Sequence, residues 1–123
     1  LYLSCKEEYL SEINYKFIIA INQILEIKTK IRFSSEFEIY GDRTEKLINI
    51  CKQCNAKVYI SGPSAKTYFN EELAKKENIL VEWMNYENYK EYEQLYPPFE
   101  HGVTILDLIL NTDANKFMKS FTQ

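Results

Sequence analysis

The turn Ser61-Gly62-Pro63-Ser64-Ala65-Lys66 holds the residue types best suited to binding a small anion. A β-branched and aromatic run precedes it and predicts a strand, and a proline suits the first turn of a helix that follows. Gly62 allows a ligand to approach the backbone closely, while two serine hydroxyls and the Lys66 ammonium can bind negative charge. The same residues also suit a plain strand-to-helix turn with serine capping. The turn lacks the glycines and the Gly-Lys-Ser/Thr ending of a P-loop.

His101 is the single histidine of the chain and precedes an apolar segment that predicts a helix. An imidazole can act as a general base near neutral pH, and a carboxylate beside it favours its charged form. We therefore take His101 as a candidate catalytic base, with Glu100 or Asp107 to orient it. The alternative is a structural or merely exposed histidine. Asp107 belongs to a narrow polar stripe with Thr104 and Asn111, which also suits a solvated helix edge.

The pair Cys51-x-x-Cys54 has the spacing of a redox or metal-binding motif. It falls at the end of a predicted helix, where the dipole does not lower a thiol pKa. A zinc site needs about four ligands, and Cys5 and His101 are the only other soft donors. Both sulfurs share an apolar stripe with Leu47 and Ile50. We therefore expect two free thiols packed in the core, in a reducing, cytoplasmic compartment, and no metal site.

Four tyrosines lie in a segment that predicts a loop, at positions 86, 89, 92 and 96. Tyrosine rings can stack on a sugar or a base, so the segment is a candidate carbohydrate-binding surface. The alternative is a lid that packs on its own domain.

The hydrophobic periodicity and the capping residues predict alternating helices and strands. Asp42 with Glu45 has the spacing of a capping box, and Ser11 and Asn70 are candidate N-caps. The helices are expected at 11–24, 42–54, 64–69, 71–77 and 103–110, and the strands at 30–33, 57–60 and 79–84.

This order predicts the α/β class, with a small parallel sheet of about three strands and helical crossovers, as in half of a Rossmann-like domain. The turns after parallel strands share one edge of a sheet. We therefore expect His101 to lie near the 61–66 turn, because the loop before it leaves the last strand at that same edge.

The composition of the chain disfavours some classes of protein function. The chain has 123 residues, enough for a single domain, and 46% of them are hydrophobic, which predicts a packed core. The formal charge is −3, so general nucleic-acid binding is disfavoured. We expect no membrane span, because no apolar run approaches about 18 residues. The chain begins with Leu1 rather than Met, and we expect a fragment of a longer protein.

Several motifs, in the right order along the chain, give a resemblance to a known family. Shorter matching segments lie at residues 34–37, 41–48 and 50–52. The two strongest are Tyr59-Ile60-Ser61-Gly62-Pro63-Ser64-Ala65-Lys66-Thr67-Tyr68 and Pro98-Phe99-Glu100-His101-Gly102-Val103-Thr104-Ile105-Leu106-Asp107-Leu108. With these segments the sequence resembles the WbqC-like family of bacterial proteins. Asn55 and Thr67 depart from the residues common there, Gly and Asp, without disturbing the match.

The resemblance implies that the chain is the C-terminal half of a protein about twice as long. It also implies a role in surface-polysaccharide (O-antigen) biosynthesis. We expect an enzyme domain that transfers a small acyl or aminoacyl group to an amino sugar, with a nucleotide sugar or another small anionic molecule as substrate. Ser61, Gly62, Ser64, Lys66 and Tyr68 would bind that substrate. No cofactor and no oligomeric state is assigned. The alternatives are a non-catalytic module that binds carbohydrate or protein, and a scaffold that completes the fold of the other half.

Overall fold

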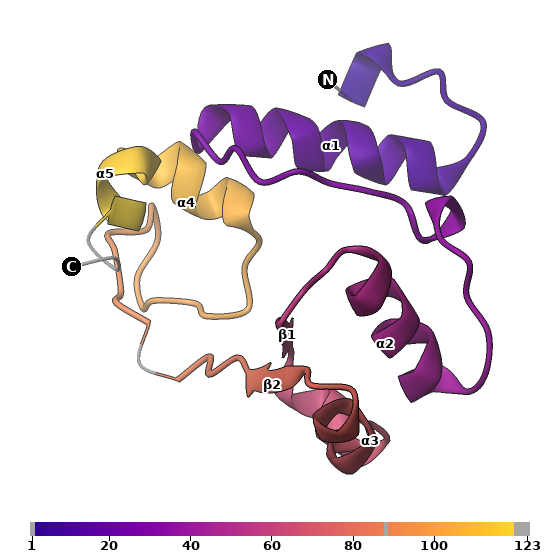
Figure 1. Ribbon diagram of the computed structural model, residues 1–123. Coiled ribbons are helices and arrows are strands. Elements are labelled where there is room, and N and C mark those ends of the chain that lie inside the picture. The colour runs from indigo at the N-terminus through magenta and orange to yellow at the C-terminus, as the bar shows by residue number, and fades with distance from the viewer. Residues whose placement is uncertain (1, 88, 120–123) are drawn as a thin grey trace. The chain divides into compact units, whose positions relative to one another are not determined.

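The computed structural model describes residues 2–87 and 89–119, and it divides the chain into two compact units. The central unit is Ile31–Tyr89, and the terminal unit combines Leu1–Lys30 with Lys90–Gln123. Figure 1 labels the elements of both units. Each unit has its own hydrophobic cluster, so each is described by itself.

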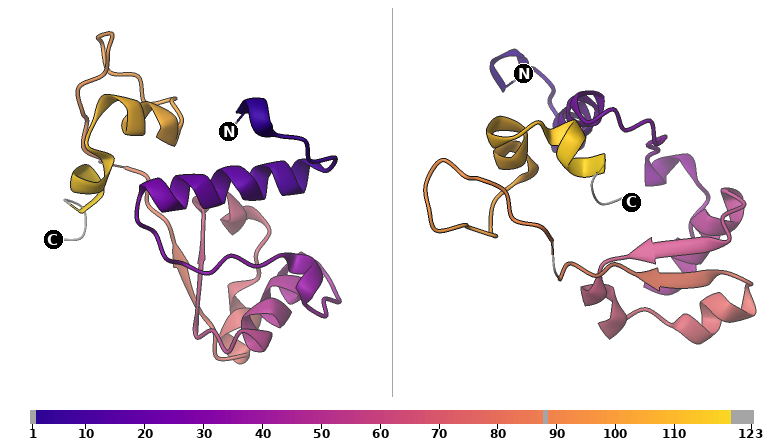
Figure 2. Two further views of the ribbon diagram at one scale, coloured as in Figure 1. Left: turned by 90° about the horizontal axis from the view of Figure 1, so that it is seen from above. Right: turned by 90° about the vertical axis from the view of Figure 1, so that its left-hand side faces the viewer.

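The central unit is built around two parallel strands. Its elements are the 3-10 helix η2 (Ser34–Glu36), α2 (Arg43–Gln53), β1 (Val58–Ser61), the 3-10 helix η3 (Pro63–Thr67), α3 (Glu71–Lys76) and β2 (Leu80–Trp83). The strands pair in register from Val58 with Leu80 to Ser61 with Trp83, and Figure 2 shows them side by side. The segment η3–α3 is therefore a helical crossover between parallel strands. The predicted α/β class with a small parallel sheet is confirmed.

The predicted first strand at 30–33 is wrong, and the sheet of the described residues has two strands rather than three. The Phe33 N–H donates to the Glu36 carboxylate at 2.7 Å, and Arg32 Nε donates to the same carboxylate at 2.8 Å. These contacts turn the chain into η2. Local hydrogen bonds to the Glu36 side chain thus replace the strand pairing that the apolar residues predicted.

Helix caps in the central unit are placed as the sequence predicted. The N–H of Glu45 donates to Asp42 Oδ1 at 2.9 Å, and the N–H of Asp42 donates to Glu45 Oε2 at 2.7 Å, which completes the capping box. Asn70 Oδ1 accepts the N–H of Leu73 at 3.1 Å, at the start of α3. These caps fix the ends of the two helices that pack on the sheet.

One face of the sheet forms the core of the central unit. Its inward side chains Tyr59, Val81 and Trp83 pack against a buried cluster from α2, α3 and the connecting turns, which consists of Ile48, Cys51, Phe69, Ala74 and Ile79. Phe69 lies between two aromatic rings. Its ring is stacked on that of Tyr59, with 5.1 Å between the ring centres, and meets that of Trp83 edge-on, with 6.0 Å between the centres. The helices therefore cover a single face of the sheet.

The terminal unit is helical. It contains the 3-10 helix η1 (Tyr2–Ser4), α1 (Leu10–Ile24), α4 (Ile105–Asn111) and α5 (Ala114–Lys119), the last of which was not predicted. Ser11 lies inside α1 and is not its N-cap. The helix α4 is less buried than predicted, because Leu108 is buried while Leu110 is 83% exposed. The small core joins Leu108 with Leu25 and Ala114.

Candidate functional site

The 61–66 turn begins at the carboxyl end of β1, as predicted, but the space beside Gly62 is already occupied. An added Cβ at Gly62 would lie 3.3 Å from the Tyr86 hydroxyl oxygen. Its φ of −70° is open to any residue, so a side chain at this position would press on Tyr86 rather than strain the backbone. Tyr86 follows β2, so the turn after one strand and the segment after the other meet here.

The helix that follows the turn is a short 3-10 helix, η3, with Pro63 at its first position and Gly62 as its N-cap. No side chain caps it, so the predicted serine capping is not observed. Ser64 uses its carbonyl oxygen to accept the Thr67 hydroxyl at 3.0 Å, and its side chain is exposed. The Ser61 hydroxyl accepts the Tyr59 hydroxyl at 3.3 Å. Both serine side chains are thus placed at or beside the end of β1.

Lys66 is held by an aromatic ring that the sequence analysis did not select. Its Nζ lies 5.6 Å from the centre of the Trp83 ring. Trp83 is paired with Ser61 in the sheet and donates its indole N–H to Glu71 at 3.0 Å. A cation above an indole face is favourable, so the ammonium stays close to the ends of both strands. Trp83 could have been selected from the sequence by its position near the end of a predicted strand.

Tyr68 extends the same surface. The Arg43 guanidinium lies 5.6 Å from the centre of its ring, and the tyrosine is exposed. We define the strand-end site as Ser61, Gly62, Ser64, Lys66, Tyr68, Trp83 and Tyr86. It offers hydroxyl groups, the Lys66 ammonium and aromatic faces, which together suit an anion attached to a sugar or a base.

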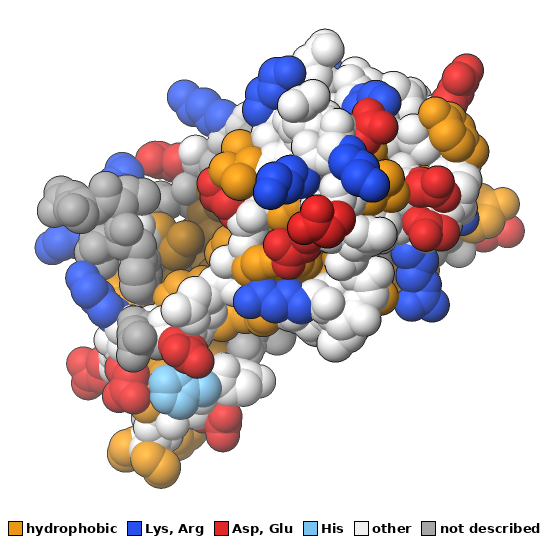
Figure 3. Space-filling model, turned by 60° about the horizontal axis from the view of Figure 1, so that its bottom comes forward, with side chains coloured by type: hydrophobic (Ala, Val, Ile, Leu, Met, Phe, Trp, Pro, Cys, Tyr) orange, Lys and Arg blue, Asp and Glu red, His pale blue; other side chains and the backbone are white. Residues whose placement is uncertain are grey.

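His101 is exposed and is oriented by neighbours in the terminal unit. Its Nε2 lies 3.4 Å from Glu91 Oε1, and its ring meets Phe99 edge-on at 4.7 Å. Figure 3 shows the exposed imidazole with acidic side chains around it. The Glu100 carboxylate is used elsewhere, because it accepts the Gly102 N–H at 2.7 Å. The carboxylate paired with the imidazole is therefore that of Glu91.

Asp107 ties the loop before α4 to that helix. Its carboxylate accepts the Tyr92 hydroxyl at 2.7 Å, Gln94 Nε2 at 2.9 Å and Asn111 Nδ2 at 3.0 Å. Gln94 in turn exchanges two hydrogen bonds with the backbone of Glu100. Burial raises the pKa of the Tyr92 phenol, and the bond to Asp107 adds to this effect. Asp107 thus positions the segment that carries His101.

Thr104 and Asn111, the other members of the predicted polar stripe, bond to the same helix. The Thr104 hydroxyl is the N-cap of α4 and accepts the Leu106 N–H at 3.3 Å. The strand-end site belongs to the central unit, whereas His101, Glu100 and Asp107 belong to the terminal unit. That His101 lies near the 61–66 turn stays a prediction.

The two cysteines differ, which corrects the predicted packing. Cys51 is buried, and burial raises the pKa of its thiol, whereas Cys54 is exposed as the C-cap of α2. The buried face of α2 runs through Thr44, Ile48 and Cys51, so Cys54 falls outside it. Both are free thiols. Among residues 2–87 and 89–119, no three His, Cys, Asp or Glu side chains are grouped to hold a metal ion.

Comparison with known proteins identifies the family. A sequence model of the WbqC-like protein family matches residues 1–118. The chain belongs to the WbqC-like family. It is also 39% identical over 114 residues to an uncharacterised protein of Mycobacterium tuberculosis. That alignment covers 93% of this chain and 49% of the mycobacterial protein, so the chain spans about half the length of this relative.

No solved structure matches the chain. In the part of the chain that the structure describes, no helix combines the length and apolar character needed to cross a membrane. Membership in the WbqC-like family therefore rests on sequence.

Proposed function

We propose that the strand-end site binds a small anionic sugar derivative, such as a nucleotide sugar, in bacterial surface-polysaccharide biosynthesis. The observation that carries the proposal is the convergence of Ser61, Gly62 and Lys66 with Trp83 and Tyr86, because these residues come from the ends of both parallel strands. Ligands of α/β proteins commonly bind at that edge of the sheet. The pathway is inferred from the resemblance to a family that is associated with O-antigen gene clusters.

The two parts of such a ligand match different groups of the site. A phosphate or carboxylate would pair with the Lys66 ammonium and accept bonds from the serine hydroxyls. A sugar or base would stack on Tyr86 and Tyr89, whose rings lie 6.5 Å apart and which are 56% and 50% exposed. The Tyr86 hydroxyl over Gly62 would then contact the ligand as well.

The proposed reaction is transfer of a small acyl or aminoacyl group from an activated ester or thioester to the amine of an amino sugar. The C–N bond forms as the bond from the acyl carbon to the donor's oxygen or sulfur breaks, and the donor's alcohol or thiol leaves. His101 would be the general base, accepting the proton of the attacking amine at Nδ1, because Nε2 faces the Glu91 carboxylate. Its exposure of 69% and its fixed orientation against Phe99 support this role. Glu91 would stabilise the imidazolium that results, while Asp107 and Glu100 would act as positioning residues.

The binding step is tested by calorimetric titration with nucleoside diphosphate sugars, using Lys66→Ala and the matched surface variant Lys57→Ala. Losing a charge-assisted bond costs about 1.5–3 kcal/mol, so Lys66→Ala should weaken binding by at least about tenfold. Lys57→Ala should bind like the unaltered protein, and melting temperatures should agree. Equal affinities for all three proteins would contradict the proposed site.

A second candidate is a non-catalytic carbohydrate-binding module. The exposed Tyr86–Tyr89 ring pair favours it, because aromatic faces bind neutral sugars without an anionic group. Titration with neutral oligosaccharides separates the two functions. Binding that survives Lys66→Ala but is lost in Tyr89→Ala would favour the module.

A further inference from the structure

The strand β2 has one edge that no strand of the described residues covers. Its Leu80 N–H donates to Lys57 O and its Met84 N–H to Ser61 O, both at 2.8 Å, across the ladder with β1. Because bonding groups alternate along a parallel strand, the N–H and C=O groups of Val81 and Trp83 point to the opposite edge. That edge is a template for a further strand.

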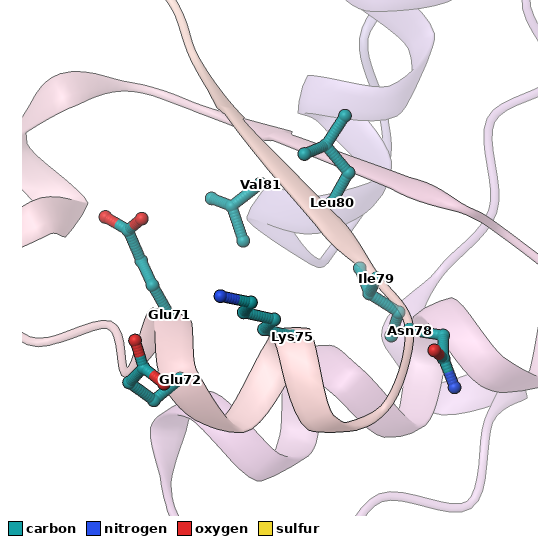
Figure 4. Close-up of a pocket in the computed structure, with 7 residues that line it drawn as sticks. All are labelled: Glu71, Glu72, Lys75, Asn78, Ile79, Leu80 and Val81. Atoms are coloured by element: carbon teal, nitrogen blue, oxygen red, sulfur yellow. The ribbon is translucent and has the colours of Figure 1, made fainter.

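A groove of about 440 Å³ runs beside this edge, between α3 and β2. Figure 4 shows Glu71, Glu72 and Lys75 of α3 on one side and the strand residues Leu80 and Val81 on the other. The groove thus combines an apolar strand wall with a charged rim. An extended peptide needs this combination when it adds to a sheet, since its backbone pairs with the edge and its side chains alternate between the two faces.

The outer face of the sheet is mostly apolar and exposed. Val58, Ile60 and Leu80 lie on this face together with Glu82, and Ile60 and Leu80 are 58% and 60% exposed. Parallel sheets occur almost only with both faces covered, and a sheet of two strands is marginal by itself. We therefore expect additional structure to cover both the unpaired edge of β2 and the outer face of the sheet.

We infer that the β2 edge takes up a strand from the other half of WbqC-like proteins, and that this half also covers the outer sheet face. The occupant follows from length, because the mycobacterial relative contains as much sequence outside the match as within it. The two halves would then share one larger parallel or mixed sheet, whether they lie on one polypeptide or on two. This inference rests on the family and the sheet, and not on ligand binding by Lys66.

The test mixes this chain with the separately expressed part of the Mycobacterium tuberculosis relative that lies outside the 114-residue match. Hydrogen exchange of backbone amides is followed by NMR. The Val81 and Trp83 amides should exchange rapidly in the chain alone and at least about 100-fold more slowly in a 1:1 complex. The amides of Leu80 and Met84 are internal controls, since they already donate to β1.

A variant pair locates the contact. Leu80→Lys places a charge on the outer face beside the groove and should weaken the complex by at least tenfold. Leu110→Lys changes another exposed leucine, in α4, and should leave the affinity unchanged. Failure to form a complex, a complex that leaves Val81 and Trp83 unprotected, or protection caused by a second copy of this chain would each overturn the inference.

Discussion

The two units hold their candidate functional residues by different means. In the central unit, the strand-end site stands on a layer of buried apolar and aromatic side chains that includes Phe69 and Ile79. In the terminal unit, three residues, Leu25, Leu108 and Ala114, form the buried cluster, and hydrogen bonds to Asp107 hold the loop that carries His101. The first site depends on packing, whereas the second combines the hydrogen bonds to Asp107 with edge-on ring contacts of Tyr92 to Phe99 and Phe117.

The largest effect is expected where packing supports the strand-end site. Phe69→Ala removes the ring between Tyr59 and Trp83 and should lower the free energy of unfolding by about 3–5 kcal/mol. The neighbouring exposed Tyr68→Ala should cost less than about 1 kcal/mol. Urea unfolding of both variants measures the difference. Similar losses of unfolding free energy in the two variants would show that the aromatic layer does not stabilise the central unit.

The polar anchor of the terminal unit should show a smaller loss that is specific to its loop. Asp107→Ala leaves Tyr92, Gln94 and Asn111 without their shared acceptor and should cost about 2–3 kcal/mol. Amide exchange should quicken at Glu100 and Gly102. The exposed Glu93→Gln is the control and should change neither quantity. An unchanged loop in Asp107→Ala would remove the positioning role of Asp107.

Thiol labelling compares two positions on one helix of the central unit. Cys54 should react promptly with a thiol reagent in the native protein, and Cys51 should react only on unfolding, because the first is exposed and the second is buried with a raised pKa. Single variants Cys51→Ser and Cys54→Ser assign the signals. Rapid labelling of Cys51 under native conditions would contradict the packed core.

The smallest effect concerns an ion pair at the start of the terminal unit. The bond from Lys16 to Glu7, at 2.7 Å, lowers the pKa of the Glu7 carboxyl from 4.5 to about 2. Because the folded pKa is depressed, any stability from this pair is present above about pH 4.5 and is lost as the pH falls toward 2. NMR titration should return the Glu7 pKa to its ordinary range in Lys16→Met. An ordinary pKa in the unaltered protein would exclude the pair.

Features that depend on adjacent residues were predictable from the sequence. The Asp42–Glu45 box and the Asn70 cap rest on contacts within three residues, so their spacing is sufficient. The strands at Val58–Ser61 and Leu80–Trp83 were predicted to within one residue at each end, since β-branched and aromatic residues mark them.

Features set by contacts between distant residues were not predictable. The pairing of His101 with Glu91 bridges ten positions of irregular loop and has no periodic signal. Cys54 was expected in the core because helical spacing was extended through the last turn, where α2 in fact ends. The ring of Trp83 under Lys66 depends on the parallel register, which joins residues that are far apart in the sequence.

The central claim, that the strand-end site binds an anionic sugar derivative, is tested most directly by NMR titration with a nucleoside diphosphate sugar. The account predicts the largest saturable shifts at the amides of residues 61–66 and at the indole N–H of Trp83, and their loss in Lys66→Ala. Shifts confined to the terminal unit, or saturable shifts that Lys66→Ala leaves intact, would contradict it.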